Sequence, residues 1–271
     1  MSALAPLSHQ AQWDEVSPRH VPVKTLLIIP CLRERARLPL FLPGLLEALS
    51  MGEGKTEVMI VDDGSGPEEQ GWLSEYVAEL QATHPGLLAP LLLQANAGKG
   101  GAVYAGWAKA APEHTHLGFV DADGAIPPAE VARLCELLPR QPDHALYAVR
   151  TGAEGTQVRR NPARGLAGQF FRLLVKTLFH FPIPETQCGC KFVPTAAFAS
   201  LAPKLTERRF CFDVDLTWHL LHLGTSIRPV PVSWTEIAGG QLRASSVLAM
   251  VRSLVQLRKT LGPWRGPTSS D

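Results

Sequence analysis

Short apolar runs alternate with longer amphipathic stretches through the first half of the chain. The apolar runs predict strands at residues 25–30, 57–61, 88–93 and 117–120. The stretches between them carry apolar residues at helical spacing, which predicts helices at 38–49, at 67–82 and from about 98 to 111. Uninterrupted apolar strands are typical of a parallel sheet that helices cover on both faces. We therefore predict an α/β fold with right-handed crossovers.

The pattern changes beyond residue 139, where the regular alternation of strand and helix ends. The second half predicts a strand at 145–149, an irregular basic segment at 150–164, a helix at 168–181, a loop and strand at 185–193, a helix at 210–223, a strand at 226–234 and a final helix at 245–261. Pro229 and Pro231 place their strand at a sheet edge. The helix at 168–181 has a wide apolar face flanked by Arg172 and Lys176, so it packs on the core or lies at a membrane interface.

Length and composition narrow the class of protein. The chain has 271 residues, which predicts one domain over 23–271 after a flexible arm over 1–22. Lys and Arg number 26 against 25 for Asp and Glu, so the charge does not favour nucleic acid as a partner. Five scattered cysteines predict reduced thiols in a cytoplasmic protein. The first residues lack a secretory signal and no apolar run approaches the roughly 20 residues that cross a bilayer, so we expect a soluble protein or one that lies on a membrane.

Residues with metal-binding and phosphate-binding chemistry follow three of the predicted strands. Asp62 and Asp63 end the second strand and Lys99 stands between glycines after the third. Asp121 and Asp123 end the fourth strand. Because the carboxyl ends of parallel strands share one edge of a sheet, we expect these groups to lie together. Paired carboxylates suit Mg²⁺ or Mn²⁺ and a lysine suits phosphate, which indicates a nucleotide diphosphate site. Taken singly, each aspartate pair is also typical of a helix cap.

Three common site patterns are missing from the sequence. The Gly98-Lys99-Gly100 segment lacks the first glycine and the Ser or Thr of a Walker motif. No Gly-x-Gly-x-x-Gly follows the first strand, and no Gly-x-Ser-x-Gly elbow is present. These absences disfavour a P-loop nucleotide hydrolase, a dinucleotide dehydrogenase and an α/β hydrolase.

Five short motifs occur in the order seen in one enzyme family. They are Val61-Asp62-Asp63-Gly64-Ser65, Asn96-x-Gly98-Lys99-Gly100-x-Ala102-Val103, Asp121-Ala122-Asp123-Gly124-Ala125, Thr186-Gln187-Cys188-Gly189-x-Lys191-Phe192 and Phe212-Asp213-Val214-Asp215-Leu216. From about Leu26 to Arg258 the chain resembles family-two glycosyltransferases of the dolichyl-phosphate β-glucosyltransferase type. The resemblance implies a glycosyltransferase A-type fold, which is a mostly parallel Rossmann-like sheet flanked by helices, with a C-terminal acceptor-side subregion.

The same resemblance implies a donor site in a nucleotide-sugar half over 23–140. The donor would be a nucleotide diphosphate sugar, with UDP-glucose the leading choice, and its hexose would be transferred with inversion. The implied donor residues are Pro30, Glu34, Asp62 and Asp63 around the base and ribose, Lys99 near the nucleotide, Asp121, Ala122 and Asp123 at the diphosphate, and Gln187 and Lys191 at the sugar. Asp121 and Asp123 would act through Mg²⁺ or Mn²⁺.

An acceptor half over 141–271, which includes the C-terminal helix, would bind a polyprenyl phosphate. Either Asp213 or Asp215 would be the catalytic acidic residue, orienting an acceptor phosphate that is already ionised or acting as general base toward an alcohol. The basic segment carries Arg150, Arg159, Arg160 and Arg164, which form a solvated surface or grip the acceptor phosphate. Arg243 would replace a lysine that the relatives carry in this part of the chain.

Two departures from the family pattern keep alternatives open. Arg33 precedes Glu34 where the relatives have Asn, and Gly239-Gly240-Gln241-Leu242-Arg243 stands where they have Gly-Ser-Lys. One alternative is a glycosyltransferase that acts on a soluble or saccharide hydroxyl acceptor. The other is a nucleotide-sugar binding module without catalysis.

Overall fold

The computed structural model describes residues 22–52, 55–153, 155–159, 162–237 and 244–266, except for the side chains of 162–167 and 244–247. In these residues a central sheet has the strand order β3-β2-β1-β4-β7-β5-β8. Its strands are β1 (Lys24–Cys31), β2 (Lys55–Asp62), β3 (Leu91–Leu92), β4 (His116–Val120), β5 (Ala145–Val149), β7 (Cys190–Pro194) and β8 (Ile227–Pro231). A small second sheet pairs β6 (Val158–Arg159) with β9 (Trp234–Thr235).

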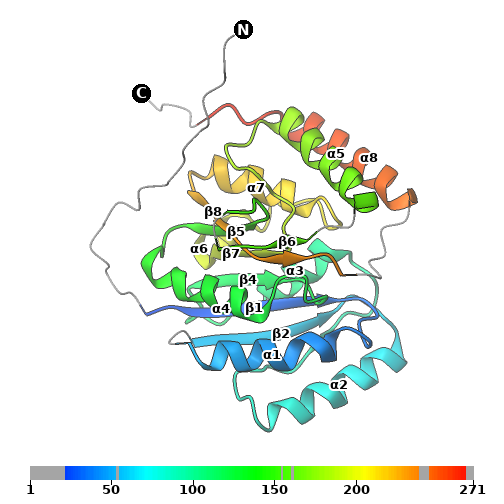
Figure 1. Cartoon of the computed structure of the whole chain (residues 1–271), viewed down its shortest axis with the longest axis vertical. Coiled ribbons are helices and arrows are strands. Elements are labelled where there is room, and N and C mark those ends of the chain that lie inside the picture. Colours follow the sequence, from blue (N-terminus) through cyan, green and yellow to red (C-terminus); the bar gives the residue numbers. More distant parts are fainter. Residues whose placement is uncertain (1–21, 53–54, 154, 160–161, 238–243, 267–271) are drawn as a thin grey trace.

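Helices cover both faces of the central sheet (Figure 1). They are α1 (Leu38–Ser50), α2 (Pro67–Gln81), α3 (Lys99–Trp107), α4 (Pro128–Leu137), the 3₁₀ turn η1 (Leu138–Arg140), α5 (Pro162–Phe179), α6 (Thr195–Leu201), α7 (Phe212–His222) and α8 (Ala244–Leu261). Successive residues of a strand point to opposite faces, so in β1 Leu27 and Ile29 pack with α1, α2 and α4 while Leu26 and Ile28 pack with α3, α6 and α7. The predicted parallel core covered on both faces is therefore confirmed.

One strand inside the sheet, β7, runs opposite to all the others. β3, β2, β1 and β4 are parallel, whereas β7 runs antiparallel to both β4 and β5. The first residue of β7, Cys190, therefore pairs with Val120, the last residue of β4. The loop that precedes β7 consequently lies at the carboxyl edge of the parallel strands, where sheets of this kind bind ligands.

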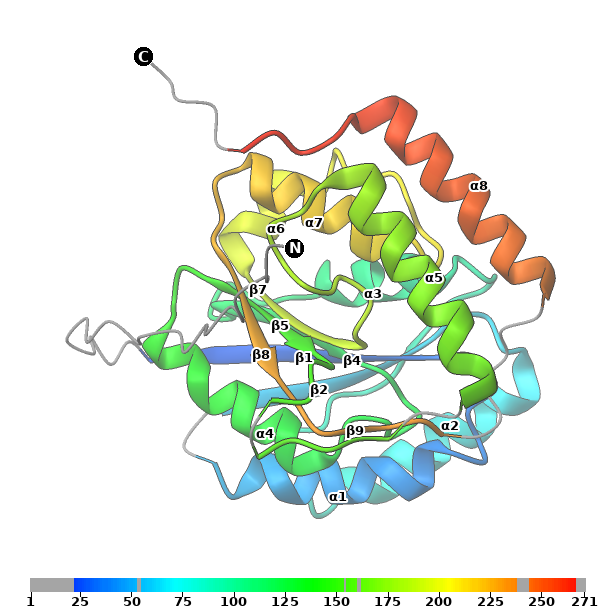
Figure 2. The ribbon, with the colours of Figure 1, turned by 45° about the horizontal axis from the view of Figure 1, so that its top comes forward.

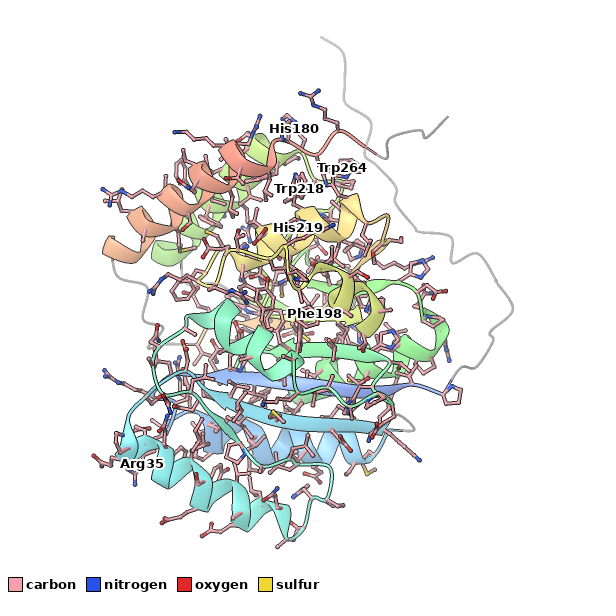
Figure 3. All side chains as sticks on the ribbon, turned by 180° about the vertical axis from the view of Figure 1, so that it is seen from behind. Arg35, His180, Phe198, Trp218, His219 and Trp264 are labelled. Carbon is pink, nitrogen blue, oxygen red and sulfur yellow. The ribbon has the colours of Figure 1, made fainter. Side chains whose placement is uncertain are left out.

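The two longest helices of the described chain, α5 and α8, lie side by side on the outer side of α7 (Figure 2). Phe171, Val175 and Phe179 of α5 share one buried cluster with Leu254 and Leu257 of α8. Trp218 and Trp264 also pack against this cluster, and both are labelled in Figure 3. Among the described residues, none of the helices combines the length and apolarity that crossing a bilayer requires.

Several predicted boundaries differ from the structure, mostly where an element is short or lies at an edge. The strand predicted at 88–93 is reduced to β3, which pairs only with β2, and the helix predicted to reach 111 ends at Trp107. The strand predicted at 226–234 is divided into β8 and β9, although β8 does lie at the predicted sheet edge.

Three further differences concern the second half and the N-terminal arm. The segment predicted as irregular contains β6, and α5 begins within it at Pro162, because proline is favoured in the first turn of a helix. The short helix α6 was missed. The arm predicted over 1–22 lies, except for Pro22, outside the described residues.

Candidate active site

Two buried aspartates at the end of β2 fix the loops at the carboxyl edge of the sheet. Asp62 Oδ1 accepts hydrogen bonds from the Ser65 backbone nitrogen at 2.9 Å and from Gln70 Nε2 at 2.8 Å. Asp63 accepts from the backbone nitrogens of Ala97 at 2.6 Å and Gly98 at 3.0 Å. Burial raises the pKa of Asp63, and these hydrogen bonds oppose the rise. Asp62 therefore holds the turn into α2 and Asp63 holds the loop that enters α3, and their predicted contact with a base and ribose stays a prediction.

The loop after β1 lies against the loop after β2. The Arg33 backbone nitrogen donates to Ser65 Oγ at 2.8 Å, and Arg37 Nε donates to Glu34 at 2.7 Å. Burial raises the pKa of Glu34, although Arg37 beside it lowers that pKa. Pro30, at the end of β1, is half-buried. Both predicted residues of this loop thus belong to the edge that carries the other candidate residues.

Asp121 and Asp123 follow β4 directly, with the buried Ala122 between them. The Asp121 backbone nitrogen donates to the Gly189 carbonyl at 2.9 Å, and a Cβ atom at position 189 would overlap the Asp121 carboxylate. Only glycine fits that position without displacing the carboxylate. Asp123 Oδ1 accepts from the Ala125 backbone nitrogen at 3.0 Å, and burial together with the nearby charge of Asp121 raises its pKa.

Lys99, the first residue of α3, forms an ion pair with Asp121. Its Nζ lies 2.6 Å from Asp121 Oδ1, and the ammonium lies 5.5 Å from the ring centre of Phe119. Burial lowers the pKa of Lys99, but the carboxylates of Asp121 and Asp213 outweigh it and raise that pKa overall. A cation at a helix N-terminus opposes the helix dipole, so this position favours an anionic partner.

The carboxylates of Asp121 and Asp123 fit a divalent cation. Both are hard oxygen donors, and the Asp121 side chain is 34% exposed, so a cation can reach its carboxylate. No group of three or more His, Cys, Asp or Glu side chains that suits a metal occurs in the described part of the chain. Two protein ligands suit Mg²⁺ or Mn²⁺ when phosphate oxygens and water complete the coordination.

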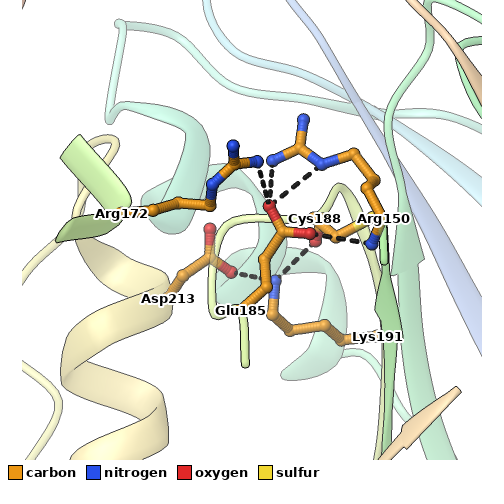
Figure 4. Close-up of polar contacts among 6 residues, drawn as sticks. All are labelled: Arg150, Arg172, Glu185, Cys188, Lys191 and Asp213. Carbon is orange, nitrogen blue, oxygen red and sulfur yellow. Dashed lines mark hydrogen bonds and ion pairs between the residues drawn. The ribbon is translucent and has the colours of Figure 1, made fainter. Parts of the chain in front are cut away.

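Lys191 and Asp213 form a second lysine–aspartate pair (Figure 4). Lys191 Nζ lies 2.6 Å from Asp213 Oδ1 and donates to the Cys188 carbonyl at 2.7 Å. Burial raises the pKa of Asp213, while Lys191 and Lys99 oppose the rise. Lys191 is fully buried, so this geometry does not support its predicted contact with the sugar.

Asp215 faces away from this pair. Its Oδ2 accepts hydrogen bonds at 2.8 Å from the backbone nitrogens of both Thr206 and Glu207, and its Oδ1 lies 3.3 Å from His219 Nε2. Asp215 therefore holds the loop before α7, whereas Asp213 lies among the charged candidate residues. Of the two acids that the sequence left open, Asp213 has the position for an active-site role.

The loop before β7 is held by a buried cluster of charged residues. Glu185 accepts hydrogen bonds from the backbone nitrogen of Arg150 at 2.9 Å and from its Nε at 3.0 Å, and Arg172 of α5 lies 3.4 Å away (Figure 4). Burial raises the pKa of Glu185, but Arg150 outweighs it and lowers that pKa overall. Gln187 in the same loop has an Nε2 atom that is buried without a partner among the described residues.

Of the five arginines predicted to bind the acceptor, the structure describes the side chains of two, Arg150 and Arg159. Arg150 pairs with Glu185 and lies 4.9 Å from the ring centre of Trp234. Arg159 is exposed on β6. Arg160, Arg243 and the side chain of Arg164 lie outside the described residues.

Sequence reasoning missed the loop of Arg208 and Arg209. The Arg208 carbonyl accepts a hydrogen bond from the Gly101 backbone nitrogen at 2.8 Å, and a Cβ atom at Gly98 would lie 3.0 Å from Arg209 Cγ. The charge of Arg209 also lowers the pKa of Asp63, against the dominant effect of burial. The loop thus adds positive charge beside the start of α3. Two adjacent arginines just before the Phe212-Asp213 motif were the available signal.

Comparisons with known proteins agree with this arrangement. Residues 26–199, more than half of the chain, match the model of Glycosyl transferase family 2. The chain is 29% identical over 94% of its length to dolichyl-phosphate beta-glucosyltransferase of Dictyostelium discoideum, covering 82% of that protein. It is 30% identical over 93% of its length to the Mus musculus protein of the same name, covering 79% of it.

A solved structure with a similar fold is glucosyl-3-phosphoglycerate synthase from Mycobacterium tuberculosis in complex with Mn²⁺, uridine diphosphate and phosphoglyceric acid. Its TM-score is 0.62 at 16% identity, with 90% of this chain and 80% of that chain covered. At this identity the likeness concerns the fold, which is of the glycosyltransferase A type, as the sequence predicted.

Proposed function

Because the chain belongs to glycosyl transferase family 2 and is a glycosyltransferase, we propose that it transfers a hexose, with inversion, from a nucleotide diphosphate sugar to a polyprenyl phosphate. UDP-glucose is the leading donor, since the relatives that resemble almost the whole chain are named dolichyl-phosphate beta-glucosyltransferases. The observation that carries the proposal is the position of Asp121 and Asp123 at the end of β4, with Lys99 2.6 Å from Asp121.

In this proposal Asp121 and Asp123 hold Mg²⁺ or Mn²⁺ at the donor diphosphate. A divalent cation supplies positive charge that offsets the negative charge developing on the leaving nucleotide diphosphate. Lys99 exchanges its contact with Asp121 for a donor phosphate oxygen, because its side chain is partly exposed and stands at the start of a helix. Gly98, with φ of 85°, lets the backbone there approach the nucleotide closely.

Asp213 orients the acceptor in this scheme. A phosphate monoester is already ionised near neutral pH, so it attacks without a strong general base. An acidic side chain fixed by Lys191 is then needed for placement more than for proton removal. An alcohol acceptor would instead require Asp213 to take its proton.

The helix pair α5 and α8 suits contact with an anionic membrane surface, where a polyprenyl phosphate resides. Phe170 and Leu173 of α5 are 60% and 58% exposed, and Leu248 and Val255 of α8 are 54% and 42% exposed. No Asp or Glu occurs in residues 155–184 or 237–270, whereas exposed basic side chains include Lys176, Arg252 and Lys259. Apolar and cationic side chains without acidic ones are the composition of an interfacial helix. We place the enzyme in the cytoplasm, in peripheral contact with the membrane.

The direct test of this function is transfer of label from UDP-glucose, with Mn²⁺ or Mg²⁺, into a polyprenyl phosphate product that partitions into organic solvent. The wild-type protein should label the lipid only with metal, and Asp121→Ala should abolish the labelling. Metal-dependent binding of uridine diphosphate without lipid labelling would keep the family assignment and refute the lipid acceptor. Failure to bind any uridine nucleotide would refute UDP-glucose as donor.

Membrane contact is tested separately by co-sedimentation with vesicles of phosphatidylcholine and phosphatidylglycerol. Leu173→Asp should weaken binding about 10-fold, because it removes an apolar contact and adds a repelled charge. The matched control is Leu40→Asp, since Leu40 is an apolar residue of α1 that lies outside the helix pair and is even more exposed than Leu173, at 86% against 58%. Equal effects of the two variants, or equal binding to vesicles of phosphatidylcholine alone, would contradict the proposed membrane surface.

A further inference from the structure

Lys191 has no route to a ligand in this structure. It lies in β7 opposite Phe119 of β4 and Tyr147 of β5, so strands enclose it on both sides. Its ammonium lies 5.0 Å from the ring centre of Phe119 and 5.1 Å from that of Tyr147. The residue is 0% exposed. A lysine so placed is stable only if protein groups satisfy its charge.

Two protein oxygens satisfy that charge. They are Oδ1 of Asp213, at 2.6 Å, and the carbonyl of Cys188, at 2.7 Å (Figure 4). Two aromatic faces lie around the same ammonium and add cation–π attraction. The ammonium therefore finds its oxygen and aromatic partners within the protein, and its burial keeps it from a substrate.

The two oxygens belong to different parts of the candidate active site. Asp213 is in the first turn of α7, and its backbone carbonyl also accepts a hydrogen bond from Thr217 Oγ1 at 2.6 Å. Cys188 precedes Gly189, whose carbonyl accepts from the Asp121 backbone nitrogen and whose Cα lies against the Asp121 carboxylate. One buried cation thus joins the acidic residue of α7 to the loop that supports Asp121.

We propose that Lys191 is a positioning residue, which fixes Asp213 and the Cys188–Gly189 backbone beneath Asp121 without touching donor or acceptor. This inference rests on the proposed sugar transfer, in which Asp213 orients the acceptor. In this role the family motif around Gly189 holds groups of the protein itself. This role also separates Lys191 from Lys99, whose side chain is 22% exposed and lies 2.6 Å from Asp121.

The test compares Lys191→Met with Lys99→Met, using calorimetric titration with uridine diphosphate and Mn²⁺ as well as the transfer rate. Lys191→Met should bind the nucleotide with full stoichiometry and an affinity within about 3-fold of wild type. Its kcat should fall about 10- to 100-fold, the scale expected when a reacting group is misplaced by about 1 Å. Lys99→Met should instead lose nucleotide affinity. Full stoichiometry distinguishes misplacement from a loss of folded protein.

A double variant shows whether Lys191 acts through Asp213. If it does, Lys191→Met/Asp213→Asn should have the kcat of Asp213→Asn alone. The reason is that Asp213→Asn already removes the carboxylate that Lys191→Met displaces. The double variant also leaves no unpaired buried charge, so it serves if Lys191→Met fails to fold. Lys191→Arg, which keeps the charge, should recover part of the lost rate.

Two results would overturn the proposal. One is a loss of nucleotide affinity in Lys191→Met as large as that in Lys99→Met, which would mean that Lys191 contacts the donor. The other is a kcat of the double variant equal to the product of the two single losses, which would mean that Lys191 acts independently of Asp213. If wild type does not label polyprenyl phosphate, the lipid acceptor fails, while nucleotide titration and donor hydrolysis by the same variants still decide the role of Lys191.

Discussion

Two lysine–aspartate pairs lie at the carboxyl edge of the sheet, with the same 2.6 Å separation and different surroundings. The side chains of Lys99 and Asp121 are 22% and 34% exposed, whereas those of Lys191 and Asp213 are 0% and 4% exposed. We call these the accessible pair and the sealed pair. A ligand or cation can replace a partner in the accessible pair. The Lys191 side chain of the sealed pair is fully enclosed and cannot exchange Asp213 for a ligand, and the small exposed part of Asp213 is what the proposed acceptor would meet.

The energetic cost of breaking the pairs differs for the same reason. An ion pair that water reaches contributes roughly 0 to 1 kcal/mol, so exchange of Lys99 from Asp121 to a phosphate costs little. Removing one partner of a buried pair leaves an unpaired charge and costs about 3 to 5 kcal/mol. The accessible pair is therefore suited to binding and release, and the sealed pair to holding a fixed geometry.

The largest effect is expected at Asp121, and it should distinguish this residue from Asp213. Asp121→Asn should lower the transfer rate about 1000-fold and abolish metal-dependent binding of uridine diphosphate, because it removes a charged ligand at the leaving group. Asp213→Asn should lower the rate as well, yet leave the nucleotide affinity within a few fold of wild type. Titration calorimetry with Mn²⁺ beside the rate assay measures both. Equal loss of nucleotide binding in the two variants would erase the distinction between the pairs.

A smaller effect is expected from the glycine that joins the two pairs. Gly189→Ala places a Cβ atom where the Asp121 carboxylate lies, so the carboxylate must move and the rate should fall about 100-fold. Gly71→Ala in α2 is the matched control, since a Cβ atom there meets no atom within 4 Å. It should leave the rate unchanged and raise the stability by about 0.5 to 1 kcal/mol. Normal metal binding in Gly189→Ala would show that Asp121 tolerates displacement.

Next in size is the loss of the cation of the accessible pair. Lys99→Met should weaken binding of uridine diphosphate about 10-fold, the value of one hydrogen bond to a charged group. Without nucleotide, the same variant should bind Mn²⁺ at least as well as wild type, because no ammonium competes for Asp121 Oδ1. Mn²⁺ binding followed by electron paramagnetic resonance checks the second point. Weaker Mn²⁺ binding would mean that Lys99 supports the metal site instead of competing for it.

The sequence predicted that Lys99, Asp121 and Asp123 lie at one edge of the sheet, although not that Lys99 pairs with Asp121. Asp121 and Asp123 directly follow an apolar strand, Lys99 lies in the segment after another, and the parallel order of the strands follows from the alternation of strand and helix. The predicted strand at 117–120 differs from β4 by one residue. Strand ends and glycines are local signals, so they can be read without knowing the partners of a strand.

The sealed pair depends on contacts that no local pattern contains. Lys191 is buried because β7 inserts antiparallel between β4 and β5, which sets Phe119 and Tyr147 on either side of it. The choice between Asp213 and Asp215 was open, since residues two apart on a helix point in nearly opposite directions and the sequence does not say which direction faces the sheet. In the structure Asp215 bonds Thr206 and Glu207 while Asp213 meets Lys191, and this difference is the basis of our proposal that Asp213 is the residue that orients the acceptor.

The smallest expected effect concerns a third buried carboxylate, Glu185, which arginines surround instead of a lysine. Arg150 holds the pKa of Glu185 below its ordinary value of 4.5 despite burial. A carboxyl group whose pKa is lower in the folded than in the unfolded protein stabilises the fold at any pH above its unfolded pKa. This stabilisation is lost as the pH falls through the pKa of the folded state. Glu185→Gln cannot titrate, so wild type should exceed it in free energy of unfolding near neutral pH. That difference should shrink as the solution is acidified below about pH 4.5, by about 1.4 kcal/mol for each pH unit by which the folded pKa lies below the unfolded one.

Chemical denaturation of wild type and Glu185→Gln at several pH values measures this difference, with Glu75→Gln, an exposed position of α2, as the matched control. The control should follow wild type at every pH. A difference between wild type and Glu185→Gln that stays constant from pH 7 to pH 3 would mean that the carboxylate is not held ionised by Arg150. Any loss of stability in acid would then have to come from other carboxylates. Asp213 of the sealed pair is not an equivalent one, because burial raises its pKa where Arg150 lowers that of Glu185.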